Sequence, residues 1–181
     1  MKWGKLYSHE FSVQFEDVDF QKVVHHPNYL KYCERARVHA MEDEGYSFLQ
    51  MLEGGYGLVV CDARLRYLNP LYFGQKFFVC TKIFAVSGAS FRVRQAIHRG
   101  GEASTSRLAA TEMEDWDALR ELNCLVDLSL VHVDATTSLP KPFHQKFLDL
   151  LGTKLIAEQF SEVDRQQKLK KLLRPEAVRI S

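Results

Sequence analysis

The sequence predicts an α+β fold in which one long helix packs on an antiparallel sheet. One helical pattern occupies residues 27–44, and four later segments alternate apolar and polar side chains as half-buried strands do. Short turns at 69–70 and 87–88 separate neighbouring strands, which is typical of antiparallel connections. With 181 residues, 46% of them hydrophobic and 26% charged, the chain is long enough for one ordinary core and too short for two comfortable domains.

Two periodicities predict the first strand and the helix. Phe11, Val13 and Phe15 alternate with polar residues, as in a strand with one buried face. Pro27 suits the first helical position, because its fixed φ is helical and the N–H it lacks would have no partner there. Gly45 is placed to end the helix in a left-handed conformation. The apolar face of the helix comprises Tyr29, Leu30, Cys33, Ala36, Ala40 and Met41.

The elements after this helix are a short helical turn and four strands. The turn covers 46–52 and ends at the glycines 54 and 55, and the strands are expected at 57–68, 75–86, 89–98 and 122–134. Five apolar residues in this framework could line a pocket, but the default expectation is that they are core: Phe20, Phe48, Val59, Val60 and Phe91.

The junction between the first strand and the helix carries the candidate chemistry. Asp19 and His26 bracket a short connector that leads into the helix. The first turn of a helix has backbone N–H groups without internal partners, and the helix dipole adds positive charge there. Such donors can hold an oxyanion that develops on a carbonyl oxygen, and the His26 backbone N–H is the leading candidate. Asp19 would then serve as a base or nucleophile.

Each of these residues also has a simpler interpretation. An aspartate before a helix is often only a turn residue or a cap, and the pair His25-His26 alone would more often be a solvated turn. A metal site is a third possibility, yet the sequence has no C-x-x-C or H-E-x-x-H motif to complete one. We therefore expect a site without metal, and only the surrounding pattern favours catalysis.

That surrounding pattern resembles the hotdog-fold acyl-CoA thioesterases of the 4-hydroxybenzoyl-CoA thioesterase and YbgC-like family. The shared motif is a strand ending in D-x-D, a hydrophobic connector, a His or Tyr, and a helix with E-R-A-R. The matching positions are Asp17, Asp19, His26, Asn28, Tyr29, Glu34, Arg35, Ala36 and Arg37. A weaker likeness continues through 57–86 and returns at 125–142, where V-H-V-D leads to L-P-K-P, so that roughly two thirds of the chain is covered.

The resemblance implies a hotdog fold, in which the sheet wraps a central helix, and it implies roles for site residues. Asp19 matches the catalytic aspartate, and His26 matches the residue whose backbone amide polarises the thioester carbonyl, with its side chain thought to assist. Asp17 is not the catalytic carboxylate in this correspondence. Family members form dimers with active sites at the subunit interface, often assembled into tetramers, so a homodimer or homotetramer is implied. Coenzyme A enters only as part of the substrate, and no separate cofactor is expected.

The expected substrate-binding residues are Asn28, Tyr29, Glu34, Val60 and Ser90. Glu34 could face the pocket or a partner subunit, or pair with Arg37 one turn along the helix. The family usually places a cation near position 87 to contact the nucleotide phosphates, and here that segment reads V-S-G-A-S-F. Arg92 and Arg94 follow, and strand alternation directs both to one face.

Composition limits the partners and the compartment. A formal net charge of +1 gives no argument for nucleic acid or an anionic membrane surface. No apolar run approaches the length of a membrane-spanning helix, and the N-terminal residues lack the core of a signal peptide. We expect a cytoplasmic protein with reduced, buried thiols at Cys33, Cys61, Cys80 and Cys124.

Two segments depart from the family pattern. An insertion at 100–121 could be a lid with Trp116 as its apolar contact, or a tolerated surface insertion, which is the commoner case. The hotdog domain is expected to end at residue 142, and 143–181 to form a helical extension. Its basic run, from Lys168 to Arg174, could touch lipid headgroups or carrier phosphates, or pack as a solvated amphipathic helix.

These observations predict a thioester hydrolase that acts on an acyl-CoA or acyl-carrier thioester. A noncatalytic hotdog module that binds an acyl carrier or scaffolds a complex is the alternative. A hotdog dehydratase or hydratase is less favoured. Such an enzyme usually carries a histidine and a carboxylate on the helix, whereas here Asp19 and His26 both precede the helix body.

Overall fold

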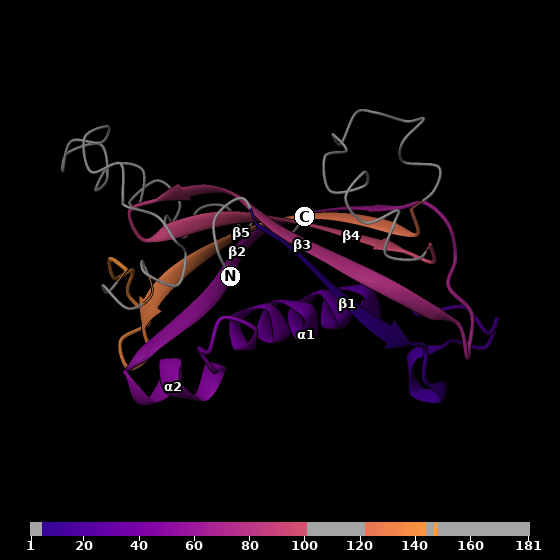
Figure 1. Ribbon diagram of the computed structural model, residues 1–181, viewed down its shortest axis with the longest axis horizontal. Coiled ribbons are helices and arrows are strands. Elements are labelled where there is room, and N and C mark those ends of the chain that lie inside the picture. Colours follow the sequence, from indigo (N-terminus) through magenta and orange to yellow (C-terminus); the bar gives the residue numbers. More distant parts are fainter. Residues whose placement is uncertain (1–4, 101–121, 144–146, 148–181) are drawn as a thin grey trace, which may run out of the picture.

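The computed structural model describes residues 5–100, 122–143 and 147, in which five strands form one antiparallel sheet around a long helix (Figure 1). In chain order the elements are β1 (Leu6–Ser12), a 3-10 turn (Phe15–Asp17), α1 (Asn28–Glu42), α2 (Phe48–Glu53), β2 (Tyr56–Tyr67), β3 (Lys76–Ser87), β4 (Ser90–His98) and β5 (Cys124–Asp134). The sheet arches over α1, and α2 lies beyond the end of α1 beside β2. This arrangement is the α+β architecture expected from the sequence.

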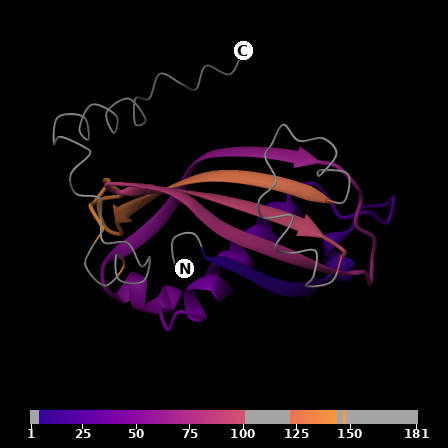
Figure 2. The same ribbon diagram turned by 45° about the horizontal axis from the view of Figure 1, so that its top comes forward.

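The strand order in the sheet is β1-β3-β4-β5-β2, so β2 lies at one edge (Figure 2). Its pairing with β5 runs from Tyr56 opposite Asp134 to Tyr67 opposite Cys124, with a bulge between Val60 and Asp62. Its other side has no strand partner among the described residues, and its middle residues are exposed. An edge strand of this kind offers unpaired backbone groups to another chain.

The helix forms where the sequence predicts it. Its buried face consists of Asn28, Tyr29, Tyr32, Cys33, Ala36, Ala40 and Met41. Pro27 is the N-cap, one position earlier than expected, with a helical φ of −67°. Gly45 has a φ of +74°, which only glycine adopts at little cost, and its N–H donates to the Glu42 carbonyl. The predicted left-handed stop is confirmed.

The predicted first strand is wrong at its C-terminal end. β1 ends at Ser12, after which the Val13 N–H donates to the Gln75 carbonyl and the chain turns. Phe15, expected on the buried face, begins the 3-10 turn and is 79% exposed, with its ring edge against Phe73. The alternation of side chains thus continues past the point where the backbone stops pairing. The other four strands and α2 lie within two residues of their predicted bounds.

Most of the five apolar residues that were expected to be core are in fact exposed. Phe91 is core as expected, but the prediction is wrong for Phe20, Phe48, Val59 and Val60, which are all exposed. Cys61 is also exposed, whereas the other three cysteines are buried, and all four thiols are free. Most of these exposed apolar side chains lie on β2 or α2, so a substantial apolar surface remains uncovered there.

The core extends past the predicted domain end at residue 142. Phe143 and Phe147 are buried and stack on each other, and both lie against Phe91 and His132. All of the predicted insertion at 100–121 except residue 100, and the rest of the C-terminal extension, including the basic run, lie outside the described residues. Neither α1 nor α2 combines the length and apolar character that a bilayer-spanning segment requires.

Candidate active site

Asp19 lies at one end of a tight turn between the first strand and the helix. Val18 and Val24 pair across this turn, the Asp19 N–H donates to the Val23 carbonyl at 2.9 Å, and the Asp19 carbonyl accepts from the Lys22 N–H at 2.9 Å. Lys22 has a φ of +64°, the left-handed conformation that lets the turn close. The connector from 19 to 26 is therefore a defined backbone structure.

The Asp19 carboxylate serves this turn with only one oxygen. Its Oδ1 accepts from the Gln21 N–H at 2.8 Å, so the turn interpretation of this residue is structurally real. Its Oδ2 has no hydrogen-bond donor among the described residues, and the side chain is partly exposed. A carboxylate held by one oxygen and open at the other can act on a substrate or a water molecule.

His26 lies at the position where the sequence predicts a backbone donor, and its role as that donor stays a prediction. Its carbonyl accepts from the Tyr67 hydroxyl at 3.1 Å, while the N–H has no acceptor within residues 5–100, 122–143 and 147. The imidazole is exposed, with its ring edge against His25 at 4.6 Å and Tyr67 at 6.4 Å between centroids. His26 is thus an exposed residue just before α1 whose N–H has no acceptor in the described part of the chain.

Asp17 lies beneath the connector. It is only 5% exposed, and its Oδ2 accepts from the Tyr32 hydroxyl at 2.5 Å and from the Gln14 N–H at 3.0 Å. Its carbonyl accepts from the His25 N–H and from the Asn28 amide, both at 2.9 Å. These bonds tie the 3-10 turn that follows β1 to the start of α1, which is a structural role.

Asn28 and Tyr29, expected to bind substrate, are buried supports of the same connector. Asn28 is engaged by the Asp17 carbonyl, and the Tyr29 hydroxyl accepts from the Leu71 N–H at 3.3 Å. Burial raises the pKa of Tyr29 to about 12, so its hydroxyl stays neutral. Direct contact of these two side chains with substrate stays a prediction.

Glu34 and Val60 line a common cavity of about 80 Å³ between α1, α2 and β2. Its other walls are formed by Arg37, Val38, Met41, Phe48, Leu58 and Leu130. Glu34 and Arg37 make no ion pair at contact distance in the described part of the chain, and the Arg37 guanidinium donates to Gln95 Oε1 at 2.8 Å. Burial lowers the pKa of Arg37, and the charge of Glu34 raises it less strongly. Of the three interpretations of Glu34, the one in which it faces a pocket agrees with its place in the cavity wall, and contact with a partner subunit stays a prediction.

Ser90 is not brought to this cavity. Leu130, which lines the cavity, lies opposite Val60 on β2 and opposite Phe91 on β4. Ser90 is the next residue along β4, so strand alternation directs it to the other face of the sheet. Arg92 shares that outer face with Arg94, as predicted: both guanidinium groups lie over the Phe84 ring, at 4.9 and 5.2 Å, and Arg94 also binds Asp127 through two bonds.

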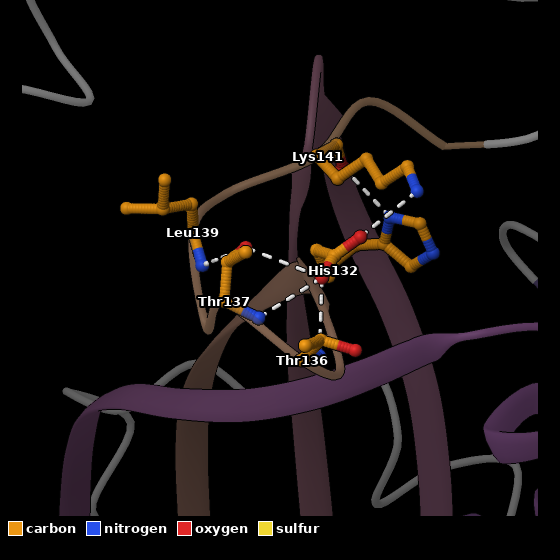
Figure 3. Close-up of polar contacts among 6 residues, drawn as sticks. His132, Thr136, Thr137, Leu139 and Lys141 are labelled. Atoms are coloured by element: carbon orange, nitrogen blue, oxygen red, sulfur yellow. Dashed lines mark hydrogen bonds and ion pairs between the residues drawn. The ribbon is translucent and has the colours of Figure 1, made fainter.

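The V-H-V-D segment ends β5, and the residues that follow it form a polar turn (Figure 3). His132 Nδ1 is 2.7 Å from the Lys141 carbonyl, and the Asp134 carboxylate accepts from the backbone of Thr136 and Thr137 and from the Lys141 ammonium. The Thr137 backbone bond, followed by Lys141, lowers the pKa of Asp134 to about 2. This carboxylate closes a turn, and its bonds give no sign of chemistry.

Sequence reasoning missed two tyrosines that shape the site. Tyr32 follows Asn28 by one helical turn, and its burial could be read from the apolar stripe, but its bond to Asp17 could not. Tyr67 ends β2, and only the folding of the sheet brings it beside His26. No local pattern in the sequence signals either contact.

The family of this chain follows from its similarity to known proteins. The sequence model of the Thioesterase-like superfamily matches residues 13–151, which is most of the chain. This chain belongs to the thioesterase-like superfamily. The match includes the connector, α1 and the five-stranded sheet except β1, and it confirms the resemblance drawn from the D-x-D and E-R-A-R motifs.

The relatives and structural neighbours agree with this membership. A putative esterase of Aquifex aeolicus is 33% identical over 44% of this chain and 62% of its own length. A putative acyl-CoA thioesterase, YneP of Bacillus subtilis, is 28% identical over 56% of this chain and 72% of its own length. The chain thus matches somewhat under two thirds of the first relative and somewhat over two thirds of the second. The structure of a 1,4-dihydroxy-2-naphthoyl-CoA thioesterase from Synechocystis superposes with a TM-score of 0.67 at 17% identity, over 83% of this chain and 98% of the other, and this likeness confirms the hotdog fold.

Proposed function

We propose that this protein hydrolyses the thioester of an acyl-CoA. The observation that carries the proposal is the pairing, on one connector, of a carboxylate oxygen and a backbone N–H that the described fold leaves unused: Asp19 Oδ2 and His26 N–H. The His25 N–H and the Asn28 side-chain amide beside them are both engaged by the Asp17 carbonyl, whereas the Asp19 Oδ2 and the His26 N–H remain available to a substrate. Membership of the thioesterase-like superfamily supports the reaction class.

The His26 N–H would hold the carbonyl oxygen of the thioester. As the carbonyl carbon becomes tetrahedral its oxygen gains negative charge, and the N–H together with the positive end of the α1 dipole stabilises that charge. Removing one such donor typically costs about 100- to 1000-fold in rate. The donor would act mainly in the transition state, where the charge is present.

Asp19 would act by one of two routes. As a general base it accepts a proton from water while the water oxygen bonds to the carbonyl carbon, and collapse of the intermediate breaks the carbon–sulfur bond. As a nucleophile its own oxygen bonds to that carbon, the coenzyme A thiolate leaves, and water then hydrolyses the resulting anhydride. In both routes the products are the free acid and coenzyme A, and the thiolate takes up a proton.

The acyl group would occupy the cavity that Glu34 and Val60 line. A volume of about 80 Å³ is small for an acyl chain, and the cavity lies at the exposed edge where Val59, Val60 and Phe48 are uncovered. A second copy of the chain paired along β2 would cover these side chains and enlarge the enclosed space. We therefore include a homodimer in the proposal.

A substrate panel tests the proposed reaction. The panel comprises acetyl-, hexanoyl-, palmitoyl-, benzoyl- and 4-hydroxybenzoyl-CoA, with hexanoyl on an acyl carrier protein as a second head group and free thiol as the readout. Release of thiol from at least one CoA thioester is the expected result. Binding of the acylated carrier without turnover of any thioester would favour the noncatalytic module, and hydration of crotonyl-CoA would favour the hydratase.

A further inference from the structure

Three successive peptide groups around His26 are held from three parts of the fold. The His25 N–H donates to the Asp17 carbonyl at 2.9 Å, at the last residue of the 3-10 turn. The His25 carbonyl accepts from the Asn28 N–H at 2.9 Å, at the first residue of α1. The His26 carbonyl accepts from the Tyr67 hydroxyl at 3.1 Å, at the last residue of β2. Each peptide plane from residue 24 to residue 27 therefore has a fixed partner.

These three hydrogen bonds leave one backbone donor free and also fix its direction. Pro27 has no N–H, so the His26 N–H is the only donor of these three peptides without an acceptor in the described part of the chain. The peptide bond between His25 and His26 is planar and trans, so this N–H points opposite to the His25 carbonyl that Asn28 holds. The next peptide, which Tyr67 holds, limits rotation about the His26 backbone.

Tyr67 differs from the other two partners because it acts through a side chain from a distant strand. Tyr67 is 50% exposed as a residue, and its ring packs edge-on against the buried Tyr29, at 5.4 Å between centroids. The ring is thus positioned by Tyr29, and the hydroxyl extends to the His26 carbonyl. Removing the hydroxyl would release the connector from β2 without removing the ring from its packing.

We propose that Tyr67 is a positioning residue for thioester hydrolysis, because its hydroxyl holds the His26 carbonyl and so keeps the adjacent N–H aimed at the thioester oxygen. This inference rests on the proposed function, in which that N–H is the oxyanion donor. Tyr67 itself need not touch the substrate.

The expected effect is on turnover and not on substrate binding. An oxyanion donor acts at about 2.7–3.1 Å from the oxygen, and its contribution is realised in the transition state. In Tyr67→Phe the donor remains but is less well held, so kcat should fall about 3- to 10-fold, less than the roughly 100- to 1000-fold for a lost donor, with KM within about twofold. Tyr72→Phe is the matched control, because Tyr72 is also half-exposed and its hydroxyl makes no hydrogen bond within the described ranges.

A second kinetic readout separates positioning from a loss of folded enzyme. Weaker support of the oxyanion makes the rate depend more on electron withdrawal by the acyl group. Tyr67→Phe should therefore lose more activity on 4-methoxybenzoyl-CoA than on 4-nitrobenzoyl-CoA. An equal loss on both would reflect a smaller active fraction and would overturn the proposal, as would an unchanged kcat or a rise in KM alone.

Nuclear magnetic resonance of protein labelled with ¹⁵N-histidine tests the geometry without any turnover. In Tyr67→Phe the His25 and His26 amide signals should shift or broaden, while those of His98 and His132, which lie in β4 and β5, stay unchanged. If wild type hydrolyses no thioester of the panel, the proposed function fails. This measurement then decides only whether the Tyr67 hydroxyl holds the peptide groups around His26. Unchanged His25 and His26 signals would overturn the positioning role in either case.

Discussion

Replacing Tyr32 by phenylalanine should destabilise the protein by about 1.5–3 kcal/mol. Tyr32 is 1% exposed, and its hydroxyl donates to the Asp17 carboxylate, which is itself buried. Hydrogen bonds to charged groups contribute about 1.5–3 kcal/mol, roughly twice the neutral kind. The substitution keeps the ring, so no cavity cost is added, and it leaves the Asp17 side chain with only the Gln14 N–H. Burial and the neighbouring Asp17 raise the pKa of Tyr32, so the hydroxyl is protonated and donates throughout the neutral range.

Urea unfolding and thermal melts would measure this loss. For a chain of this length about 1 kcal/mol corresponds to roughly 2–4 °C, so the melting temperature should fall by roughly 3–12 °C. Tyr72→Phe removes the same hydroxyl from a half-exposed ring and should stay within about 0.5 kcal/mol of wild type. A Tyr32→Phe protein as stable as that control would show that Asp17 is not held by Tyr32, and the description of the connector would be incorrect.

Three further predictions concern the stop of α1, the turn after β5 and the edge strand. Gly45→Ala should lower stability by about 1–2 kcal/mol in urea unfolding, because the φ of +74° strains any residue with a Cβ; no loss would contradict the left-handed stop. Asp134→Asn should melt below wild type at pH 7. The pKa of Asp134 is lowered to about 2, so its carboxylate stabilises the fold above its ordinary pKa of 3.8 and this contribution is lost toward pH 2; a gap in melting temperature that stays constant from pH 7 to pH 2 would refute it. Val60→Lys should shift a homodimer toward monomer in light scattering, and an unaltered mass would exclude the β2 edge as the interface.

Local features of the fold could be predicted from the sequence, and long-range ones could not. The 3.6-residue period of α1 and its glycine stop are properties of one segment, so both were evident before the structure. The order β1-β3-β4-β5-β2 depends on which distant strands meet, and periodicity carries no such information. The error at Phe15 has the same origin, because alternation of side chains does not reveal where backbone pairing ends.

The residues of the candidate site also fall into those that a local motif predicts and those that only the folded sheet places. Asp19 and His26 belong to one connector, so a short motif could identify both. Tyr67 and Ser90 are placed by the sheet: the first is brought to His26, and the second is directed to the outer face. The exposure of Val60 could not be predicted either, because a pattern of apolar residues does not distinguish a core from a surface that another chain covers.

The most direct test of the proposed chemistry is the kcat of Asp19→Asn on the best acyl-CoA of the panel. The asparagine keeps the size of the side chain and can still accept from the Gln21 N–H, so the turn should persist. Glu16→Gln is the matched control, an exposed carboxylate in the neighbouring 3-10 turn. We expect kcat to fall about 100- to 10,000-fold in Asp19→Asn and to stay near wild type in Glu16→Gln, with both melting temperatures close to wild type. A folded Asp19→Asn protein that turns over within threefold of wild type, on the order of the experimental scatter between preparations, would contradict the assignment of Asp19 as the base or nucleophile.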